Sequence, residues 1–217
     1  MGEDRLILLF DLDGTLIDST EAILESFHHS FDFYKTPRKS DGEIEALIGY
    51  PLDIMFSRLG IDETMVWEYV ATYKEHYQKI SREKTVLLPF AKEAIERASK
   101  IATLGIVTTK TGKYSRVLLE HFGVMHYFDV LIGREDVEHP KPDAQPILKA
   151  LEQIGSDDTN IWMIGDTKLD LLSAAAAGVN AIGVCSGYDS CEVLNTYTQN
   201  IFSDALEAVM YLESQKE

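Results

Sequence analysis

Cysteine is scarce in this chain of 217 residues, which contains only Cys185 and Cys191. No further pair of Cys or His residues stands at metal-binding spacing, so the sequence does not indicate a zinc site built on thiolates. We therefore expect two incidental thiols that stay reduced, as in a cytoplasmic protein.

Long apolar runs and basic residues are also missing. The longest apolar run near the N-terminus, residues 6–10, is too short to cross a membrane, and the residues before it do not fit a signal peptide. Only 20 Lys and Arg stand against 36 Asp and Glu, a formal charge of −16. Nucleic acids and anionic membranes are therefore poor partners, because both need cations that neutralise phosphate. An acidic protein that handles a phosphate must gather its few cations or bind a metal.

What the chain does have is an alternation of short apolar runs with helical patterns. Each run ends in polar residues or glycine, as is typical of parallel strands buried on both faces. The runs span residues 6–11, 104–109, 128–133, 161–166 and 180–185. Helical patterns lie between them, beginning near Pro89 and over residues 114–122, 143–154 and 168–177. This alternation predicts an α/β fold with a doubly wound parallel sheet.

One segment, residues 18–85, interrupts the alternation. It contains no convincing strand, and its aromatic residues recur at helical spacing, for example Phe27, Phe31 and Tyr34. Such a stripe favours the core of a small helical bundle over a cofactor site. We therefore predict a helical domain over 18–85, inserted into a core domain formed by 1–17 and 86–217. An insert that leaves the first strand at its carboxyl end emerges beside the ligand crevice of an open sheet, so it is a candidate lid.

Two acids, Asp11 and Asp13, follow the first apolar run in the sequence DLDG. Side chains alternate along an extended chain, so both acids can face one way while Leu12 enters the core. Asp166 ends a later apolar run in the same manner, and Asp170 follows in the first turn of a helix, where the helix dipole alone could explain it. If the two strands are close, the acids converge on a hard divalent cation, for which Mg²⁺ is the expected choice.

Two further polar residues stand near strand ends. Thr108 closes the second run and can donate a hydroxyl hydrogen bond, and Lys141 lies between two prolines in the sequence HPKPD. Taken singly, Thr108 fits an ordinary strand residue and Lys141 an exposed surface lysine. Beside four acids at strand ends, a lone lysine is a suitable partner for a phosphate.

These motifs, in this order, resemble those of the haloacid dehalogenase superfamily: residues 11–15 (DLDGT), Thr108, Lys141 and residues 165–170 (GDTKLD). The helical insert is similar to the C1 cap of that superfamily. The resemblance implies a phosphatase of the phosphoglycolate phosphatase type, in which the Asp11 nucleophile forms an aspartyl-phosphate and Asp13 moves the proton. It also implies that Asp11, the backbone carbonyl of Asp13 and Asp166 hold Mg²⁺, with Asp170 acting through a water.

The sequence indicates the type of reaction more clearly than it indicates the substrate. We take it to be a small phosphorylated molecule, and the candidate residues that bind it are Gly14, Gly49, Tyr50, Thr109 and Lys110. Departures from the phosphoglycolate phosphatases occur at Thr109 and at residues 88–90 and 138–140. Rival activities are those of an inorganic pyrophosphatase, a nucleotidase, a sugar-phosphate phosphatase or a mutase similar to β-phosphoglucomutase. A catalytically silent binding protein on the same fold is the non-enzymatic alternative. The sequence does not give the oligomeric state.

Overall fold

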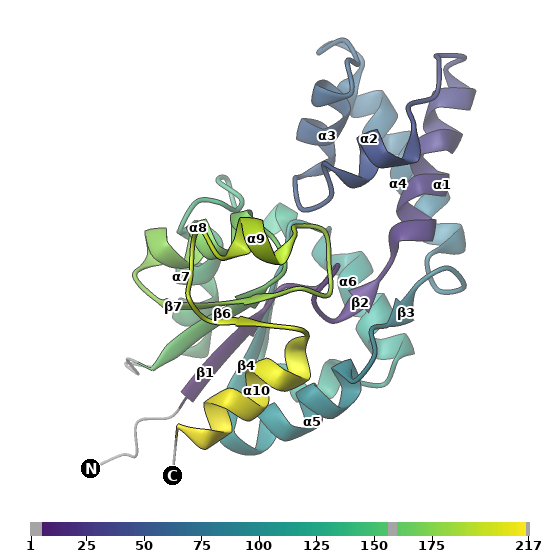
Figure 1. Ribbon diagram of the computed structural model, residues 1–217. Coiled ribbons are helices and arrows are strands. Elements are labelled where there is room, and N and C mark those ends of the chain that lie inside the picture. The colour runs from purple at the N-terminus through teal and green to yellow at the C-terminus, as the bar shows by residue number, and fades with distance from the viewer. Residues whose placement is uncertain (1–5, 156–159, 216–217) are drawn as a thin grey trace.

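The computed structural model describes residues 6–155 and 160–215 and contains a parallel sheet of six strands (Figure 1). The order across the sheet is β5-β4-β1-β6-β7-β8, so β1 lies at its centre. The strands are β1 (Leu6–Phe10), β4 (Ala102–Val107), β5 (Val130–Ile132), β6 (Ile161–Gly165), β7 (Asn180–Val184) and β8 (Ile201–Phe202). The doubly wound α/β sheet predicted from the sequence is confirmed, while the short strand β8 was not predicted.

Helices cover both faces of this sheet. The side chains of Leu6, Leu8 and Phe10 pack on one face with α5, α6 and α10, whereas Ile7 and Leu9 pack on the other with α7 and α8. All five residues of β1 are buried, because neither face of a central parallel strand meets water. These helices and the short α9 are α5 (Ala91–Ile101), α6 (Gly112–His121), α7 (Gln145–Ile154), α8 (Lys168–Ala177), α9 (Cys191–Leu194) and α10 (Ala205–Ser214).

Four further helices form a separate layer beside the carboxyl ends of the strands (Figure 1). They are α1 (Thr20–Phe33), α2 (Asp41–Glu45), α3 (Leu52–Arg58) and α4 (Val66–Ile80). We call them the cap helices. Their core is aromatic: the Phe27 ring lies 4.5 Å from that of Phe56 and 5.0 Å from that of Tyr73. The aromatic stripe of the sequence thus packs as a bundle core, as expected.

A two-stranded antiparallel ribbon connects the cap helices to the sheet. It pairs β2 (Ile17–Asp18) with β3 (Val86–Leu87). The ribbon places the two chain crossings side by side, so both connections between the layers run through one narrow point. The two strands of the ribbon lie at the two predicted ends of the insert, near residues 18 and 85. The division of the chain at 18–85 stays a prediction. No helix in the described part of the chain is both long and apolar enough for a transmembrane span.

Candidate active site

The acids of the first motif lie at the end of β1 but point to different places. The backbone amide of Asp11 donates to the carbonyl oxygen of Ile164 at 2.9 Å, which continues the pairing of β1 with β6. The Asp11 side chain is buried beneath the ends of the strands. The Asp13 carboxylate instead receives a hydrogen bond from the Ser19 hydroxyl and forms an ion pair with Lys110 at 2.9 Å. The two acids therefore occupy different environments although one residue separates them.

Three buried acids, Asp11, Asp166 and Asp170, gather at the strand ends, and two of them contact Lys141. One carboxylate oxygen from each acid lies within 4.8 Å of those of the other two. The Lys141 ammonium is 2.9 Å from Asp11 Oδ1 and 2.5 Å from Asp170 Oδ1, and it also donates to the carbonyl oxygen of Val107 at 3.0 Å. The Lys141 ammonium thus has partners on Asp11, Asp170 and Val107, and Lys141 is buried rather than exposed at the surface. The Asp13 carboxylate does not join this group.

The buried group contains three acids but only one ammonium, which contacts Asp11 and Asp170. Burial raises the pKa of Asp11 to about 7, with Lys141 opposing the shift and Asp170 adding to it. Burial also raises the pKa of Asp166 well above its usual range, and the nearby Asp11 contributes. For Lys141, burial lowers the pKa, but Asp11 and Asp170 outweigh it and raise the pKa overall. The raised pKa values mean that ionising all three acids together is unfavourable unless a bound cation neutralises their charge.

The residues present fit a hard divalent metal such as Mg²⁺. All three acids offer oxygen ligands, which Mg²⁺ prefers. Asp11 Oδ1 is buried and accepts no hydrogen bond in the described part of the chain, although it faces Lys141 in an ion pair. Such an atom retains a lone pair for a metal.

Asp166 and Asp170 are each held by neighbouring donors. Asp166 Oδ1 accepts from the Thr15 hydroxyl at 2.8 Å. Asp170 Oδ2 accepts from the backbone amide and the hydroxyl of Thr167, at 3.0 and 2.7 Å, as the capping box of α8. Gly14 adopts φ +81°, and a Cβ there would lie 2.2 Å from Asp166 Oδ2, so only glycine fits. Gly14 therefore shapes the acid group as well as the turn.

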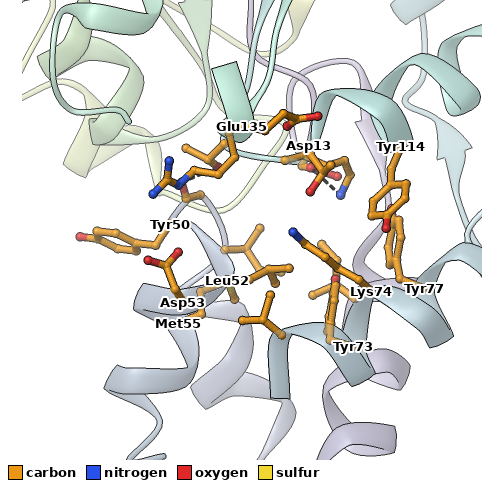
Figure 2. Close-up of a pocket in the computed structure, with 18 of the residues that line it drawn as sticks. Asp13, Tyr50, Leu52, Asp53, Met55, Tyr73, Lys74, Tyr77, Tyr114 and Glu135 are labelled. Atoms are coloured by element: carbon orange, nitrogen blue, oxygen red, sulfur yellow. Dashed lines mark hydrogen bonds and ion pairs between the residues drawn. The ribbon is translucent and has the colours of Figure 1, made fainter. Parts of the chain in front are cut away.

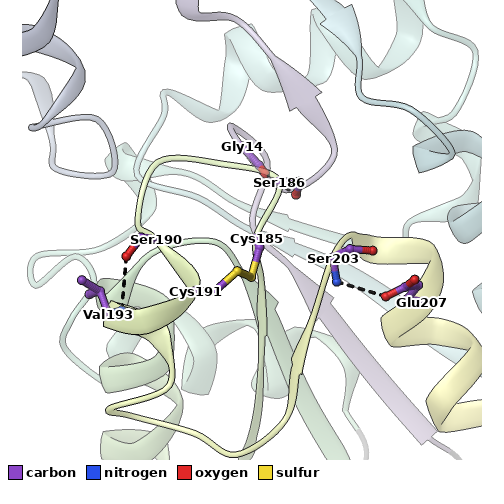
Figure 3. Close-up of a disulfide and its surroundings, with 8 residues drawn as sticks. All are labelled: Gly14, Cys185, Ser186, Ser190, Cys191, Val193, Ser203 and Glu207. Atoms are coloured by element: carbon purple, nitrogen blue, oxygen red, sulfur yellow. Dashed lines mark hydrogen bonds between the residues drawn. A yellow bond between two sulfur atoms is a disulfide. The ribbon is translucent and has the colours of Figure 1, made fainter.

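A loop after β7, residues 185–191, lies beside Gly14 (Figure 3) and also contacts Asp166. The backbone amide of Tyr188 donates to Asp166 Oδ2 at 2.9 Å, and the Ser186 hydroxyl donates to the carbonyl oxygen of Gly14 at 2.8 Å. A disulfide between Cys185 and Cys191 closes the loop. The expectation of two incidental thiols was wrong: the end of β7 and the start of α9 bring the two Cα atoms to 5.4 Å, within the range that a disulfide spans.

Thr108 and Thr109 follow β4 and face different partners. Thr108 is buried, and its hydroxyl accepts a hydrogen bond from the backbone amide of Lys110 at 3.2 Å. The Thr109 hydroxyl donates to the carbonyl oxygen of Gly49 at 2.8 Å, which joins the sheet layer to the cap helices. Gly49 itself has φ +106° and lies against Thr167. Two residues predicted to bind substrate, Thr109 and Gly49, are thus bonded to each other.

A cavity of about 260 Å³ lies between the cap helices and the carboxyl ends of the strands (Figure 2). Asp13 and Lys110 line it at the sheet, and Gly49 and Tyr50 line it from the cap. Asp11 and Lys141 do not line this cavity, so it adjoins the buried acid group through Asp13. Most residues predicted at this site thus lie in one of two parts, a buried acid group and a cavity above it, while Thr108 contacts the second part through the Lys110 amide.

Several site residues were not identified from the sequence. Ser19, Thr167 and Ser186 donate to the acids or to the turn that carries them, and Tyr188 does so through its backbone. The serine in DLDGTLIDS and the threonine in GDTKLD could have been found, because each stands in a motif beside an acid. The Tyr188 contact leaves no comparable signal, since any residue type provides a backbone amide.

The chain is similar to known proteins in both sequence and structure. A model of the haloacid dehalogenase-like hydrolase family matches residues 8–184. The chain is 30% identical over 213 residues to the pyrophosphatase PpaX of Bacillus velezensis, with 96% of each chain covered. A haloacid dehalogenase-like hydrolase from Bacteroides fragilis has a similar structure, with a TM-score of 0.88, 28% identity, and 94% and 99% of the two chains covered. The structure of a predicted phosphoglycolate phosphatase from Haemophilus somnus has a TM-score of 0.87 at 22% identity, with 97% of this chain and 99% of that chain covered.

Proposed function

The chain belongs to the haloacid dehalogenase-like hydrolase family, and from this premise we propose that it is a magnesium-dependent phosphatase that uses Asp11 as its nucleophile. The observation that carries the proposal is the pair of environments at the end of β1. Asp11 is buried against Lys141, whereas Asp13 faces the cavity. These two environments support attack on phosphorus by Asp11 and proton transfer to a leaving group by Asp13.

In the proposed reaction, Asp11 attacks the phosphorus atom, the bond to the leaving oxygen breaks, and an aspartyl-phosphate forms. Asp13 protonates the leaving oxygen and then takes a proton from the water that hydrolyses the aspartyl-phosphate. Lys141 orients Asp11 and offsets the charge that its carboxylate brings toward a phosphate dianion. Thr108 lies at the neighbouring strand end, where its hydroxyl can donate to a phosphoryl oxygen.

Asp11, Asp166 and Asp170, with the backbone carbonyl of Asp13, are the groups that would hold Mg²⁺. When bound, the ion would supply the positive charge that the approach of a carboxylate to a phosphate requires. Thr15 and the Tyr188 amide keep both oxygens of Asp166 in fixed positions for this role.

Two substrates are suggested by similar proteins. The relative from B. velezensis is named a pyrophosphatase, and the protein from H. somnus is named a predicted phosphoglycolate phosphatase. The names favour pyrophosphate over phosphoglycolate, because the first relative is the more similar in sequence. Location in the cytoplasm stays a prediction. The Cys185–Cys191 disulfide does not support it, because the cytoplasm usually keeps thiols reduced.

Hydrolysis of phenyl phosphate by the wild-type protein and by Asp11→Asn, with Mg²⁺ and with EDTA, tests the proposal. We expect Mg²⁺-dependent release of phosphate that Asp11→Asn lowers by at least about 1000-fold. Lys79→Met, on the exposed side of α4, serves as the control and keeps full activity. Equal rates in the wild type and Asp11→Asn would identify a non-enzymatic protein or a different nucleophile.

A further inference from the structure

Building on the proposed phosphatase activity, we propose that the substrate is an organic phosphate monoester whose leaving group has an apolar ring and a second anionic group, bound by Lys74. Neither pyrophosphate nor phosphoglycolate has such a leaving group. The proposal depends on the walls of the cavity, its size and the one lysine of the cap that lines it.

The cap side of the cavity is mostly apolar. Aliphatic side chains form one part of it, and the rings of Tyr73 and Tyr77 form another, with the ring of Tyr114 from α6 of the sheet layer beside them (Figure 2). The aliphatic residues are Ile23, Ile48, Leu52, Met55 and Val70. A phosphate or glycolate leaving group would fill little of this space and would lose water against the apolar walls, which is unfavourable for a charged group even where a lysine pairs with it. An apolar ring would gain from burial there and from contact with the tyrosine faces.

The size of the cavity supports the same conclusion. One water molecule needs about 10–15 Å³ of such volume. The cavity, at about 260 Å³, has room for a leaving group of many atoms beyond the position of the phosphoryl group. Asp13 lines the cavity where the leaving oxygen would receive its proton, so a bulky leaving group would extend from Asp13 toward α3 and α4.

Lys74, on α4, points its ammonium into this cavity (Figure 2). Among the described residues, no hydrogen bond or ion pair engages it. Lys110, by contrast, is already paired with Asp13 and lies over the Tyr77 ring at 4.7 Å. Lys79, on the same helix, is paired with Glu75 at the surface. Arg134, which lines the cavity from the sheet layer, donates through Nη1 to the carbonyl oxygen of Val137 at 3.0 Å and has a buried Nε without a partner among the described residues. On the cap side of the cavity, Lys74 is therefore the available cation.

The acids that line the cavity limit where an anionic group can lie. Glu135 is occupied, because it accepts from the backbone amides of Gly112 and Lys113. Asp53 lies beside Tyr50, away from Lys74 (Figure 2). An anionic group of the leaving group would be repelled at the Asp53 side and attracted at Lys74. The ring and the charge of the leaving group thus have separate places in the cavity.

The test compares phenyl phosphate with 4-carboxyphenyl phosphate on the wild type, Lys74→Met and the control Lys79→Met. We expect Lys74→Met to lower kcat/KM for the carboxylated substrate about tenfold or more, because a charge-assisted contact is lost. The same variant should change kcat/KM for phenyl phosphate less than twofold. Lys79→Met should change neither. Comparing variants on each substrate removes the difference in intrinsic reactivity between the two phenols.

Two results would overturn the inference. One is an equal loss for both substrates in Lys74→Met, which would assign Lys74 a general role. The other is a higher kcat/KM for pyrophosphate or phosphoglycolate than for 4-carboxyphenyl phosphate in the wild type. Either result leaves the phosphatase proposal intact as long as hydrolysis depends on Asp11. Loss of that dependence would instead refute the phosphatase proposal.

Discussion

The backbone amide of Tyr188 donates a hydrogen bond to Oδ2 of Asp166 at 2.9 Å, which connects the loop after β7 to a buried acid at the end of β6. On the other side, the Thr15 hydroxyl holds Oδ1 of the same acid. Asp166 is therefore fixed by two segments that lie far apart in the sequence. Substitutions in the 185–191 loop should therefore displace Asp166, although no acid is itself substituted.

Gly187→Ala should disable the site. A Cβ at Gly187 would lie 2.0 Å from Asp166 Oδ2, so either the loop or the acid must move. A displacement of about 1 Å in such a site costs on the order of 100-fold in rate. We expect kcat/KM for phenyl phosphate to fall by at least about that factor. Gly42→Ala, where a Cβ meets nothing within 4 Å, is the matched control and should keep full activity.

The Cys185–Cys191 bond should stabilise the fold through this loop. Closing a short loop by a disulfide contributes about 2 kcal/mol to the free energy of unfolding. We expect the double variant Cys185→Ser/Cys191→Ser to lose about that amount in denaturant unfolding. Reductant should lower the stability of the wild type toward that of the variant and leave the variant unchanged. A wild type that is indifferent to reductant would speak against the disulfide in solution.

Asp166→Asn should make the metal-free protein more stable at pH 8. Burial raises the pKa of Asp166, so the folded state holds its proton more tightly than the unfolded state does. The charged side chain therefore costs stability once the pH rises above its unfolded pKa of about 4, and the cost grows up to the raised folded pKa. In EDTA, we expect Asp166→Asn to be more stable than the wild type at pH 8, and the difference to shrink toward pH 4. A loss of stability at pH 8 would contradict the charge imbalance.

Phe90→Gly should also stabilise the protein. Phe90 adopts φ +63° before α5, a conformation that costs a residue with a Cβ about 1 kcal/mol, and its side chain is 60% exposed. We expect the melting temperature to rise by about 2–4 °C. Phe33→Gly, at a similarly exposed position in α1, should instead lower it, because glycine weakens a helix. A lower melting temperature for Phe90→Gly would mean that the Phe90 side chain makes contacts that outweigh its backbone cost.

The sequence was sufficient to predict the central strands and the positions of the acids. A buried parallel strand such as β1 is a continuous apolar run, and an acid that follows it stands out, as Asp11 and Asp166 do. The topology then brings those strand ends together, because β1 lies between β4 and β6. Local pattern alone was enough for these features.

Other features depend on tertiary contacts that leave no local pattern. The pairing of Cys185 with Cys191 requires the turn between β7 and α9. The two residues of β8 are too few for an alternation of apolar and polar positions. That the Lys74 ammonium has no partner in the described part of the chain is apparent only once the contacts of the neighbouring lysines are known. These are properties of the assembled chain rather than of any segment.

The central claim is that Asp11 becomes phosphorylated, and mass spectrometry of the intact protein and its Asp11 peptide tests it most directly. The experiment uses 4-nitrophenyl phosphate, whose leaving group departs without protonation, and Asp13→Asn, which lacks the base that activates water for the second step. We predict that Asp13→Asn accumulates one phosphoryl group on Asp11, and that Asp11→Asn/Asp13→Asn accumulates none. A phosphoryl group on another residue, or equal labelling of both variants, would contradict the account.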